Sequence, residues 1–403
     1  MSLNLFEHVA LAYQPIWGLN RQLAGVRLRL HALSPATVDA AHLLTQLANT
    51  WSDQSPTLVL SFAQTALLKQ ALAAEPLDGV WLEVPDYGDD EPPGMVAALA
   101  QAHGLGHRLV HDAALRHARV WPATGPGQHR YLLHLWPEDV QRVQAAVAAG
   151  GEGSPLMSGQ LYRDLGRREV AAHALDQRHA WGVCGWPQDD VLAAHRRYGV
   201  PVDKRTLVRV QQALMKESAM DHVEALIHQD AVLTYRVLRL VNSPVFGTSR
   251  DVTTVRQALM LLGQRRLRDW LLELMPGASA DLDLLPVRLG LVLRAQIMEN
   301  LMDAGVEQDL ATEIYVTGLF SGLDRLTQEP LSTALRRVPA SEAMVQALLL
   351  QSGPYFAYYD IARRMESFEA QGSLAAFCQN TGFALDSVNR ALLRTLSQWR
   401  NQL

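Results

Sequence analysis

The two halves of the chain differ in the period of their hydrophobic positions. The first half alternates short apolar runs, as at 58–60, 80–82, 108–110 and 131–133, with stretches of helical spacing that are rich in Ala and Leu. Strands that alternate with helices predict a mostly parallel α/β arrangement. From about residue 195 onward the spacing stays helical, and strand signals almost disappear. The pattern therefore predicts an α/β domain followed by an all-helical domain. The helical stretches of the first half lie at 38–48, 63–74, 95–102 and 140–149.

The most regular helical pattern of the chain begins at Asp230. This residue stands at an N-cap position, and Pro244 ends the helix because the residue before a proline disfavours the α conformation. Thr254 and Gln257 resemble a capping box at the start of a second helix, which Gly263 interrupts. These residues predict a compact unit of three short helices. The apolar stripe of the first helix consists of Leu233, Val237, Leu240 and Val241.

This stretch resembles a known family. The strings LTYRVLRLVNSPVFG, from Leu233, and VRQALMLLGQRRLRDW, from Val255, are similar to the signature of HDOD domains. HDOD domains are helical relatives of the HD metallophosphohydrolases that have lost the metal site. The resemblance covers about residues 195–403. It implies that Ser321 and Gly322 stand where the hydrolases carry their His-Asp pair.

The distribution of histidine also argues against hydrolysis in the helical half. All fourteen histidines lie at or before His228, so the rest of the chain contains none. A phosphohydrolase of the HD type needs several imidazoles together with carboxylates to hold its metal and to activate water. We therefore predict that the helical domain is not an enzyme and holds no metal and no cofactor.

The α/β half resembles a second family on weaker motifs. The string QPI near the N-terminus and the string GVRLR from Gly25 are similar to the opening of EAL domains, which are TIM-barrel phosphodiesterases of cyclic di-GMP. The two resemblances together imply a bacterial EAL-HDOD signalling protein. Its parts are a degenerate EAL-like TIM (β/α) barrel at 1–190 and an HD-related all-helical HDOD domain at 195–403. We expect the barrel to be reduced, because its length falls short of the usual ~250 residues.

Carried over position by position, the EAL resemblance leaves a vestigial nucleotide site. Arg27 stands where the family has a metal-binding glutamate, and Glu83 and Asp112 are the family carboxylates that remain. Two separate carboxylates cannot assemble a two-metal cluster, so the resemblance implies no catalysis in this domain. Trp136 and Trp181 lie at the ends of predicted strands. We expect them to fill the barrel mouth where metal and substrate would otherwise sit.

One histidine pattern has the spacing of a metal site. His103, His107 and His111 are four residues apart, which on a helix would place three imidazoles on one face. Gly104 and Gly106 interrupt this segment. The pattern therefore favours the end of a helix, a turn and then a strand, and we predict no metal site here.

Arginines surround the helical signature, and two interpretations of them stay open. They form either a solvated helix face with internal ion pairs or a docking surface for an acidic partner or a phosphate-bearing ligand. Asn242, Ser243 and Gly247 either build the turn after the first helix or belong to the same docking surface. The candidate partner-binding residues are Arg236, Arg239, Asn242, Ser243, Phe246, Arg265 and Arg266.

Composition narrows the class of protein. A hydrophobic content of 48% in 403 residues suffices for two cores, and a net charge of -5 argues against a dedicated nucleic-acid binder. The sequence lacks a run of about eighteen apolar residues and the features of a signal peptide. The two cysteines form no disulfide framework. We therefore expect a cytoplasmic protein without a membrane span.

Three functions remain. The first, which we prefer, is a non-catalytic signalling protein that acts through contacts with other signalling or regulatory proteins, both ancestral phosphodiesterase sites being lost. The second is a receptor that binds cyclic di-GMP through the barrel without hydrolysis. The third is an enzyme in either domain, and the missing ligands make it the least compatible with the sequence.

Overall fold

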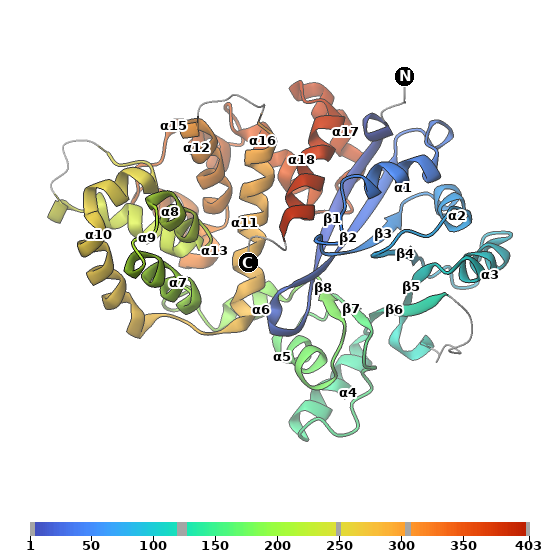
Figure 1. Ribbon diagram of the computed structural model, residues 1–403. Helices are drawn as coiled ribbons and strands as arrows, with labels where there is room; N and C mark the ends of the chain where they lie inside the picture. The colour runs from blue at the N-terminus through green and yellow to red at the C-terminus, as the bar shows by residue number, and fades with distance from the viewer. Residues whose placement is uncertain (1–4, 119–126, 247–250, 303–307, 400–403) are drawn as a thin grey trace. The chain divides into compact units, whose positions relative to one another are not determined.

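The protein forms two compact units in the computed structural model (Figure 1). The first unit consists of two separate segments, Met1–Pro187 and Arg363–Leu403, and the second consists of Gln188–Ala362. Our predicted helical domain ran to residue 403, whereas this last segment lies in the compact unit that contains the N-terminal half. The structure describes residues 5–118, 127–246, 251–302 and 308–399.

The first unit contains a closed barrel of eight strands that follow one another in sequence order. Strands β2 to β8 run parallel, and β1 is antiparallel to both of its neighbours, β2 and β8. The expected α/β barrel is present and closed, so the expectation of a reduced barrel is wrong for the strands. The strands are β1 (Val9–Trp17), β2 (Leu23–Ala32), β3 (Thr57–Phe62), β4 (Val80–Val84), β5 (Arg108–Ala114), β6 (Gln128–His134), β7 (Leu161–Arg163) and β8 (Gly182–Cys184).

The direction of β1 follows from its short connection to β2. Residues 18–22 join the two strands and contain only the 3-10 turn η2 (Leu19–Arg21). A parallel pair needs a crossover of about a dozen residues or more, so this short connection forces an antiparallel hairpin. The barrel departs here from the all-parallel arrangement of a TIM barrel.

Helices connect most of the parallel strands. The predicted strands of the first half are confirmed, and its four predicted helices are confirmed to within a few residues at each end. Between β5 and β6 the described residues hold only the 3-10 helix η4 (Leu115–His117), and residues 119–126 lie outside the described part. The connecting helices are α1 (Ala40–Ala48), α2 (Thr65–Ala73), α3 (Met95–Leu105), α4 (Pro137–Ala148) and α5 (Arg168–Ala172).

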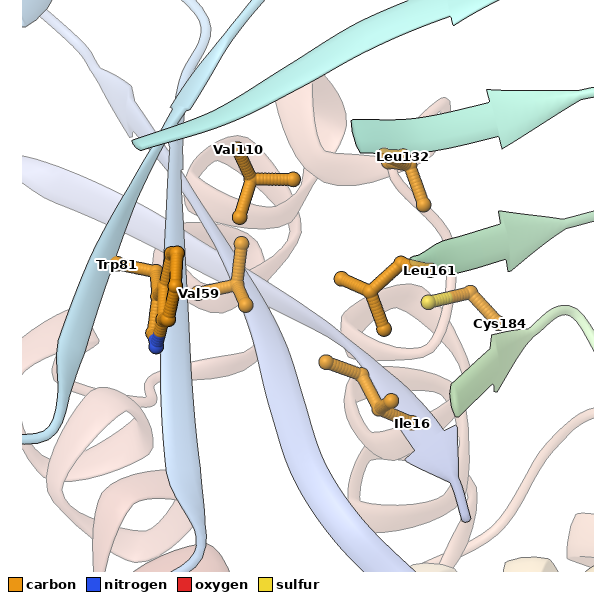
Figure 2. Packing of buried hydrophobic residues seen from close by; sticks show 7 residues of the cluster. All are labelled: Ile16, Val59, Trp81, Val110, Leu132, Leu161 and Cys184. Atoms are coloured by element: carbon orange, nitrogen blue, oxygen red, sulfur yellow. The ribbon is translucent and has the colours of Figure 1, made fainter. Parts of the chain in front are cut away.

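An apolar cluster fills the middle of the barrel. Seven of the eight strands contribute one side chain each, and Figure 2 shows these side chains pointing toward one another. None of the seven is more than 5% exposed, so the barrel interior is a packed core and not a pore. The cluster consists of Ile16, Val59, Trp81, Val110, Leu132, Leu161 and Cys184.

The tryptophans do not fill the barrel mouth, by which we mean the end of the barrel where the parallel strands finish. Trp181 packs against the apolar cluster, with its ring centroid 5.3 Å from that of Trp81. Trp181 precedes β8 and Trp81 lies near the start of β4, so both are at the amino ends of their strands. Trp136 follows β6 but is 45% exposed and lies under the guanidinium of Arg116. The prediction for Trp136 and Trp181 is therefore wrong.

Two C-terminal helices complete the first unit. Helices α17 (Gln371–Thr381) and α18 (Leu385–Gln398) pack against β1 (Figure 1). The side-chain amide of Gln371, only 2% exposed, donates hydrogen bonds to the carbonyls of Ala10 on β1 and Arg29 on β2, at 2.6 and 2.7 Å.

Asn389 on α18 forms the second of these attachments. Its side chain is fully buried and donates to the carbonyls of Phe6 and Val9, at 2.8 and 2.7 Å. Its Oδ1 accepts the N–H of Leu11 at 3.3 Å. Buried backbone groups need hydrogen-bond partners, so these two amides make the C-terminal segment part of the barrel structure.

The second unit is helical, as predicted. Among its described residues the β interactions amount to one isolated bridge between Asp203 and Ser279. No helix within the described ranges is both long and apolar enough to cross a membrane. Its helices are α6 (Gln188–Ala193), α7 (Lys204–Met215), α8 (Met220–His228), α9 (Ala231–Val241), α10 (Val255–Leu274), α11 (Leu285–Asn300), α12 (Gln308–Phe320), α13 (Leu323–Thr327), α14 (Leu331–Leu335), α15 (Glu342–Leu349) and the start of α16 (Phe356–Met365).

The predicted helix boundaries around the signature are confirmed. The Asp230 carboxylate accepts the N–H groups at the start of α9, and the Thr254 hydroxyl accepts the N–H of Gln257 at the start of α10. Gly263 has φ 67° and ψ 162°, which breaks α10 at this residue. Gly247, which we expected in the turn between the two helices, lies outside the described residues.

Asp230 also joins three elements of the helical unit. Its side chain is fully buried and accepts the N–H of Asp203 at 2.7 Å, just before α7. It also accepts Nη1 of Arg288 on α11 at 2.8 Å, and Arg288 donates to the carbonyl of Pro201 at 2.5 Å. A buried ion pair therefore holds the starts of α7 and α9 against α11.

Candidate functional site

A ring of polar side chains lies at the mouth of the barrel, directly beyond the apolar cluster. Side chains along a strand alternate between its two faces, so the residue two positions after a cluster member points the same way. On β3 to β7 this residue is polar in every case. We call the following residues the polar ring: Gln14, Arg27, Ser61, Glu83, Asp112, His134 and Arg163.

One side of the polar ring is centred on a buried pair, Arg27 and Glu83. Nε and Nη2 of Arg27 donate to the two carboxylate oxygens of Glu83 at 2.5 and 2.6 Å, and Nη1 donates to Gln14 at 3.2 Å. The Ser61 hydroxyl donates to Glu83 at 3.1 Å. The Arg27 and Glu83 side chains are only 11% and 4% exposed, so the carboxylate is neutralised and its oxygens are occupied.

The electrostatics of this pair keep Arg27 charged. Burial lowers the pKa of Arg27, but the surrounding groups, chiefly the Glu83 carboxylate and also Cys184 and Asp112, together raise it by more, so the net pKa lies above the ordinary value. Burying a charge is tolerated when a hydrogen-bonded partner of opposite sign replaces water. The structure thus places a fixed positive charge against one of the two predicted carboxylates.

The other side of the polar ring is centred on Asp112. Nε and Nη2 of Arg163 on β7 donate to its two carboxylate oxygens at 3.2 and 3.4 Å. His134 on β6 lies 3.7 Å from Asp112 and 3.3 Å from Arg163. These side chains are 18 to 29% exposed, so this half of the ring is open to solvent.

A phenylalanine from the C-terminal segment covers part of the polar ring. The guanidinium of Arg27 lies 4.8 Å from the ring centroid of Phe368, and that of Arg29, the next inward residue on β2, lies 5.6 Å from it. The Nε of Arg29 is buried and has no hydrogen-bond partner among the described residues. An aromatic ring therefore contacts two guanidinium groups at this end of the barrel.

The donor set of the polar ring does not fit a two-metal hydrolytic centre. Such a centre holds two ions about 3.5 to 4 Å apart, and several convergent carboxylates must be free to bind them. Here each carboxylate is held by an arginine. Within the residues that the structure describes, no group of three His, Cys, Asp or Glu side chains could hold a metal ion.

The structure brings the three predicted residues of the vestigial site, Arg27, Glu83 and Asp112, to one end of the barrel. The sequence did not reveal Arg163 or Phe368 as members of this site. Alternation along β7 is the one available signal for Arg163, since it follows the buried Leu161 by two positions. Phe368 had no signal, because nothing in its segment predicts contact with a strand more than 300 positions earlier.

Three histidines meet elsewhere in the first unit. Nε2 of His111 lies 2.9 Å from Nδ1 of His129, and Nε2 of His129 lies 2.9 Å from Nδ1 of His103. Burial and then the neighbouring His129 lower the pKa of His111 to about 3. His107 bonds instead to the carbonyl of Ala74. The segment has the predicted order of helix end, turn and strand, and the imidazoles form a chain.

Two of the candidate partner-binding residues build the turn after α9, and the others lie on α9, on α10 or in the turn itself. Asn242 donates to the carbonyls of Leu238 and Val252 and accepts the N–H of Val252, while Ser243 donates to the carbonyl of Leu240. The structure thus gives Asn242 and Ser243 the turn-building role.

The other candidates remain at or near the surface. Arg236 is half-buried, and burial lowers its pKa. Phe246 is also half-buried, whereas Arg239 on α9 and both Arg265 and Arg266 on α10 are exposed. Helices α9 and α10 pack against each other. A partner-binding role for these residues stays a prediction.

An open cleft of about 470 Å³ lies in the helical unit, beside α6 and α13. Arg325 lines it and donates to Asp189 at 2.7 Å and to Gln188 at 2.9 Å. Its lining is mostly charged, whereas small-molecule sites are mostly apolar with a few polar groups. Arg325 and Asp189, two of the charged residues that line this cleft, are thus already paired with each other.

Comparisons with known proteins place part of the chain. Residues 200–321 match the HDOD domain. A segment of 209 residues is 26% identical to the cyclic di-GMP phosphodiesterase CdgJ of Vibrio cholerae serotype O1 and covers 52% of this chain and 48% of that protein. A segment of 147 residues is 25% identical to the uncharacterized protein YuxH of Bacillus subtilis and covers 35% of each chain. The chain thus spans about half or less of the length of these relatives.

Among solved structures, the MmoQ response regulator of Methylococcus capsulatus is 19% identical, with a TM-score of 0.40 and coverage of 49% of this chain and 98% of the MmoQ chain. The match at residues 200–321 lies within the helical unit and includes the helices of the sequence signature. The chain therefore contains an HDOD domain at residues 200–321.

Proposed function

We propose that this protein is a non-catalytic signalling protein that acts through contacts with other signalling or regulatory proteins. The observation that carries the proposal is the pairing of both carboxylates of the polar ring with arginines, Glu83 with Arg27 and Asp112 with Arg163. Metal-dependent hydrolysis of a phosphodiester needs such carboxylates free to hold ions. The relative CdgJ is named a phosphodiesterase, and this proposal separates the present chain from that activity.

In the HDOD domain, too, an arginine lies beside the position of a lost metal ligand, and this supports the proposal. Ser321, which the family resemblance places at the lost His-Asp pair, accepts a hydrogen bond from Nη1 of Arg294 at 2.8 Å and donates one to the carbonyl of Gly318. An arginine therefore stands beside a position where a metal ligand would be needed. A fixed cation repels a divalent metal, so the chemistry of both units points away from metal catalysis.

Helix α10 offers a surface that suits protein contact. Met260 and Leu272 are 70% and 56% exposed, and the arginines Arg265 and Arg266 are exposed on the same helix. Exposed apolar side chains together with arginine are features of interfaces, where both contribute strongly to binding. This mixture favours the docking interpretation of the signature over a purely solvated face.

The test combines an activity assay with partner capture. Purified protein should release no product from cyclic di-GMP with either magnesium or manganese present, and release of product would reject the proposal. Arg265→Glu with Arg266→Glu should reduce the recovery of whatever protein the wild type captures from the source cells. The control is Arg336→Glu, an exposed arginine elsewhere in the same unit, which should leave recovery unchanged.

A second candidate function is a receptor that binds cyclic di-GMP without hydrolysing it. Two observations at the barrel mouth favour it. The Arg163 side chain is partly exposed, and the buried Nε of Arg29 has no hydrogen-bond partner among the described residues. Arginine forks suit phosphate. Titration with cyclic di-GMP separates the candidates, since binding without turnover supports the receptor and absence of binding supports the contact protein. In the first case Arg163→Ala should weaken the binding.

A further inference from the structure

The C-terminal segment returns to the barrel after the whole helical unit and is fixed there at two buried points. Gln371 and Asn389 bind backbone groups on and beside β1 and β2, and both side chains are at most 2% exposed. Side chains that are buried and fully hydrogen-bonded are costly to displace. Helices α17 and α18 are therefore the fixed part of this segment.

The turn that precedes Gln371 differs from these fixed points. It covers residues 366–370, carries Phe368, and contains only half-buried and exposed side chains. One hydrogen bond of the turn is local, the N–H of Ala370 donating to the Ser367 hydroxyl at 3.2 Å. Segments with few buried contacts and local hydrogen bonds open more easily than the core around them. The turn can thus move while α17 stays attached.

The contact of Phe368 with the two arginines is weak compared with the hydrogen bonds that a guanidinium can form. Arg27 already has Glu83, but the Nε of Arg29 is buried without a described hydrogen-bond partner. An aromatic face satisfies a guanidinium less well than a carboxylate, a phosphate or water does. Phe368 therefore covers Arg29 and leaves part of its hydrogen-bonding capacity unused.

We propose that the turn 366–370 is an autoinhibitory cover, with Phe368 as its tip and Gln371 as its hinge point. In the closed state Phe368 lies over Arg27 and Arg29 and restricts the approach of anions to them, and in the open state it uncovers them. This inference concerns the barrel mouth and stands apart from the contacts proposed for α10. The cover follows α16 directly, and α16 begins in the helical unit, so a displacement of that helix would reach the cover along the backbone.

Chemical labelling of arginine tests the cover without any assumption about a natural ligand. The intact protein is treated with p-hydroxyphenylglyoxal, and the labelling rate of each arginine is followed by peptide mass spectrometry. In Phe368→Ala, Arg29 should be labelled roughly two- to fivefold faster than in the wild type. This is the increase in the open state expected from the loss of one cation–π contact. Equal rates at Arg29 in the two folded proteins would overturn the proposal.

A matched control lies in the same segment. The ring of Phe377 on α17 contacts Arg364, with 4.5 Å between the ring centroid and the guanidinium carbon. Phe377→Ala should speed the labelling of Arg364 and leave Arg29 at its wild-type rate. Acceleration of Arg29 in this variant as well would mean general loosening of the segment and would also overturn the proposal.

A measurement on the wild type guards against a variant that fails to fold. The labelling rate of Arg29 is followed in urea concentrations below the unfolding transition. A local cover opens with little exposure of surface, so the rate should depend only weakly on urea. A rate at Arg29 that rises in step with global unfolding would show that the cover does not open by itself.

Discussion

Arg27 and Glu83 are each almost fully buried, so each charge depends on the other in place of water. Removing one partner of such a pair leaves a buried charge without compensation, which costs about 3–5 kcal/mol. We expect Arg27→Ala to lower the free energy of unfolding by that amount, measured by urea denaturation. Arg163→Ala is the control, because its pair with Asp112 is partly exposed and is worth about 0–1 kcal/mol. Equal losses for the two variants would contradict the buried-pair account.

His228 gives a prediction about pH. Its ring nitrogen Nε2 is buried without a hydrogen-bond partner among the described residues, and its ring lies 5.3 Å from that of Tyr315. Burial lowers the pKa of His228 from 6.5 to about 4. The folded state thus keeps it neutral while the unfolded chain binds a proton, so stability is lost as the pH falls from 6.5 toward 4.

The loss assigned to His228 is at most about 3.5 kcal/mol, because the pKa falls from 6.5 to about 4 and each unit of pKa difference is worth about 1.4 kcal/mol. Unfolding free energies of the wild type and of His228→Gln should be measured at several pH values across this window. The variant should lose less stability than the wild type on acidification. Parallel curves for the two proteins would mean that His228 does not carry this linkage.

At the residue scale the sequence predicted which residues belong to the site better than it predicted the residues that they contact. Arg27 stood out because it occupies a position where a related site would need a carboxylate, and the structure puts it beside Glu83. Arg163 did not stand out, although it holds Asp112, because β7 is only three residues long and offers too little alternation to define an inward face. Phe368 could not be predicted because its contact depends on tertiary packing alone.

At the element scale, α9 shows how a local signal and a distant one combine. The sequence predicted Asp230 as an N-cap, and the cap is present, but its ion pair with Arg288 joins residues 58 positions apart and left no local pattern. We expect Asp230→Ala to cost about 3–5 kcal/mol, since it removes both the cap and the partner of a buried arginine. Thermal or urea unfolding measures this loss.

The control for this prediction is another aspartate cap. Asp39 caps α1 through the N–H groups of Ala41 and His42, is exposed, and has no described ion pair. Asp39→Ala should therefore cost only about 1 kcal/mol. Asp230→Asn should fall in between, because asparagine keeps the cap and loses the charge. A cost for Asp230→Ala no larger than that for Asp39→Ala would reject the role of the ion pair.

The strands divide in the same way. Those of five to seven residues between 57 and 134 gave clear apolar runs and were predicted. The strands β7 and β8, of three residues each, gave none that we could separate from loop. The antiparallel direction of β1 could have been expected, because its connection to β2 is too short for a crossover.

At the scale of the whole molecule, the barrel unit is discontinuous in sequence. Residues 363–403 belong to it although the entire helical unit lies between them and β8. The sequence could not reveal this, because the hydrophobic pattern of a helix indicates that one face is buried but not which unit that face packs against. The attachment depends on two amide side chains that bind strand backbone, and such contacts carry no periodic signal.

Two asparagines allow this organisation to be tested reciprocally. Asn389 makes three hydrogen bonds to backbone groups at β1, and Asn242 makes three to backbone groups at the end of α9 and before α10. Each replacement by alanine leaves backbone groups without partners and should cost at least about 2 kcal/mol. Hydrogen–deuterium exchange followed by mass spectrometry reports which part of the chain is loosened.

Asn389→Ala should accelerate exchange in β1 and β2 and leave α9 and α11 at the wild-type rate. Asn242→Ala should do the reverse, because the two compact units have separate cores and a local loss of stability spreads first within its own cooperative unit. Each variant thus serves as the control for the other. If Asn389→Ala loosened α9 and α11 as much as β1, the C-terminal segment would have to support both units, and its assignment to the barrel alone would be wrong.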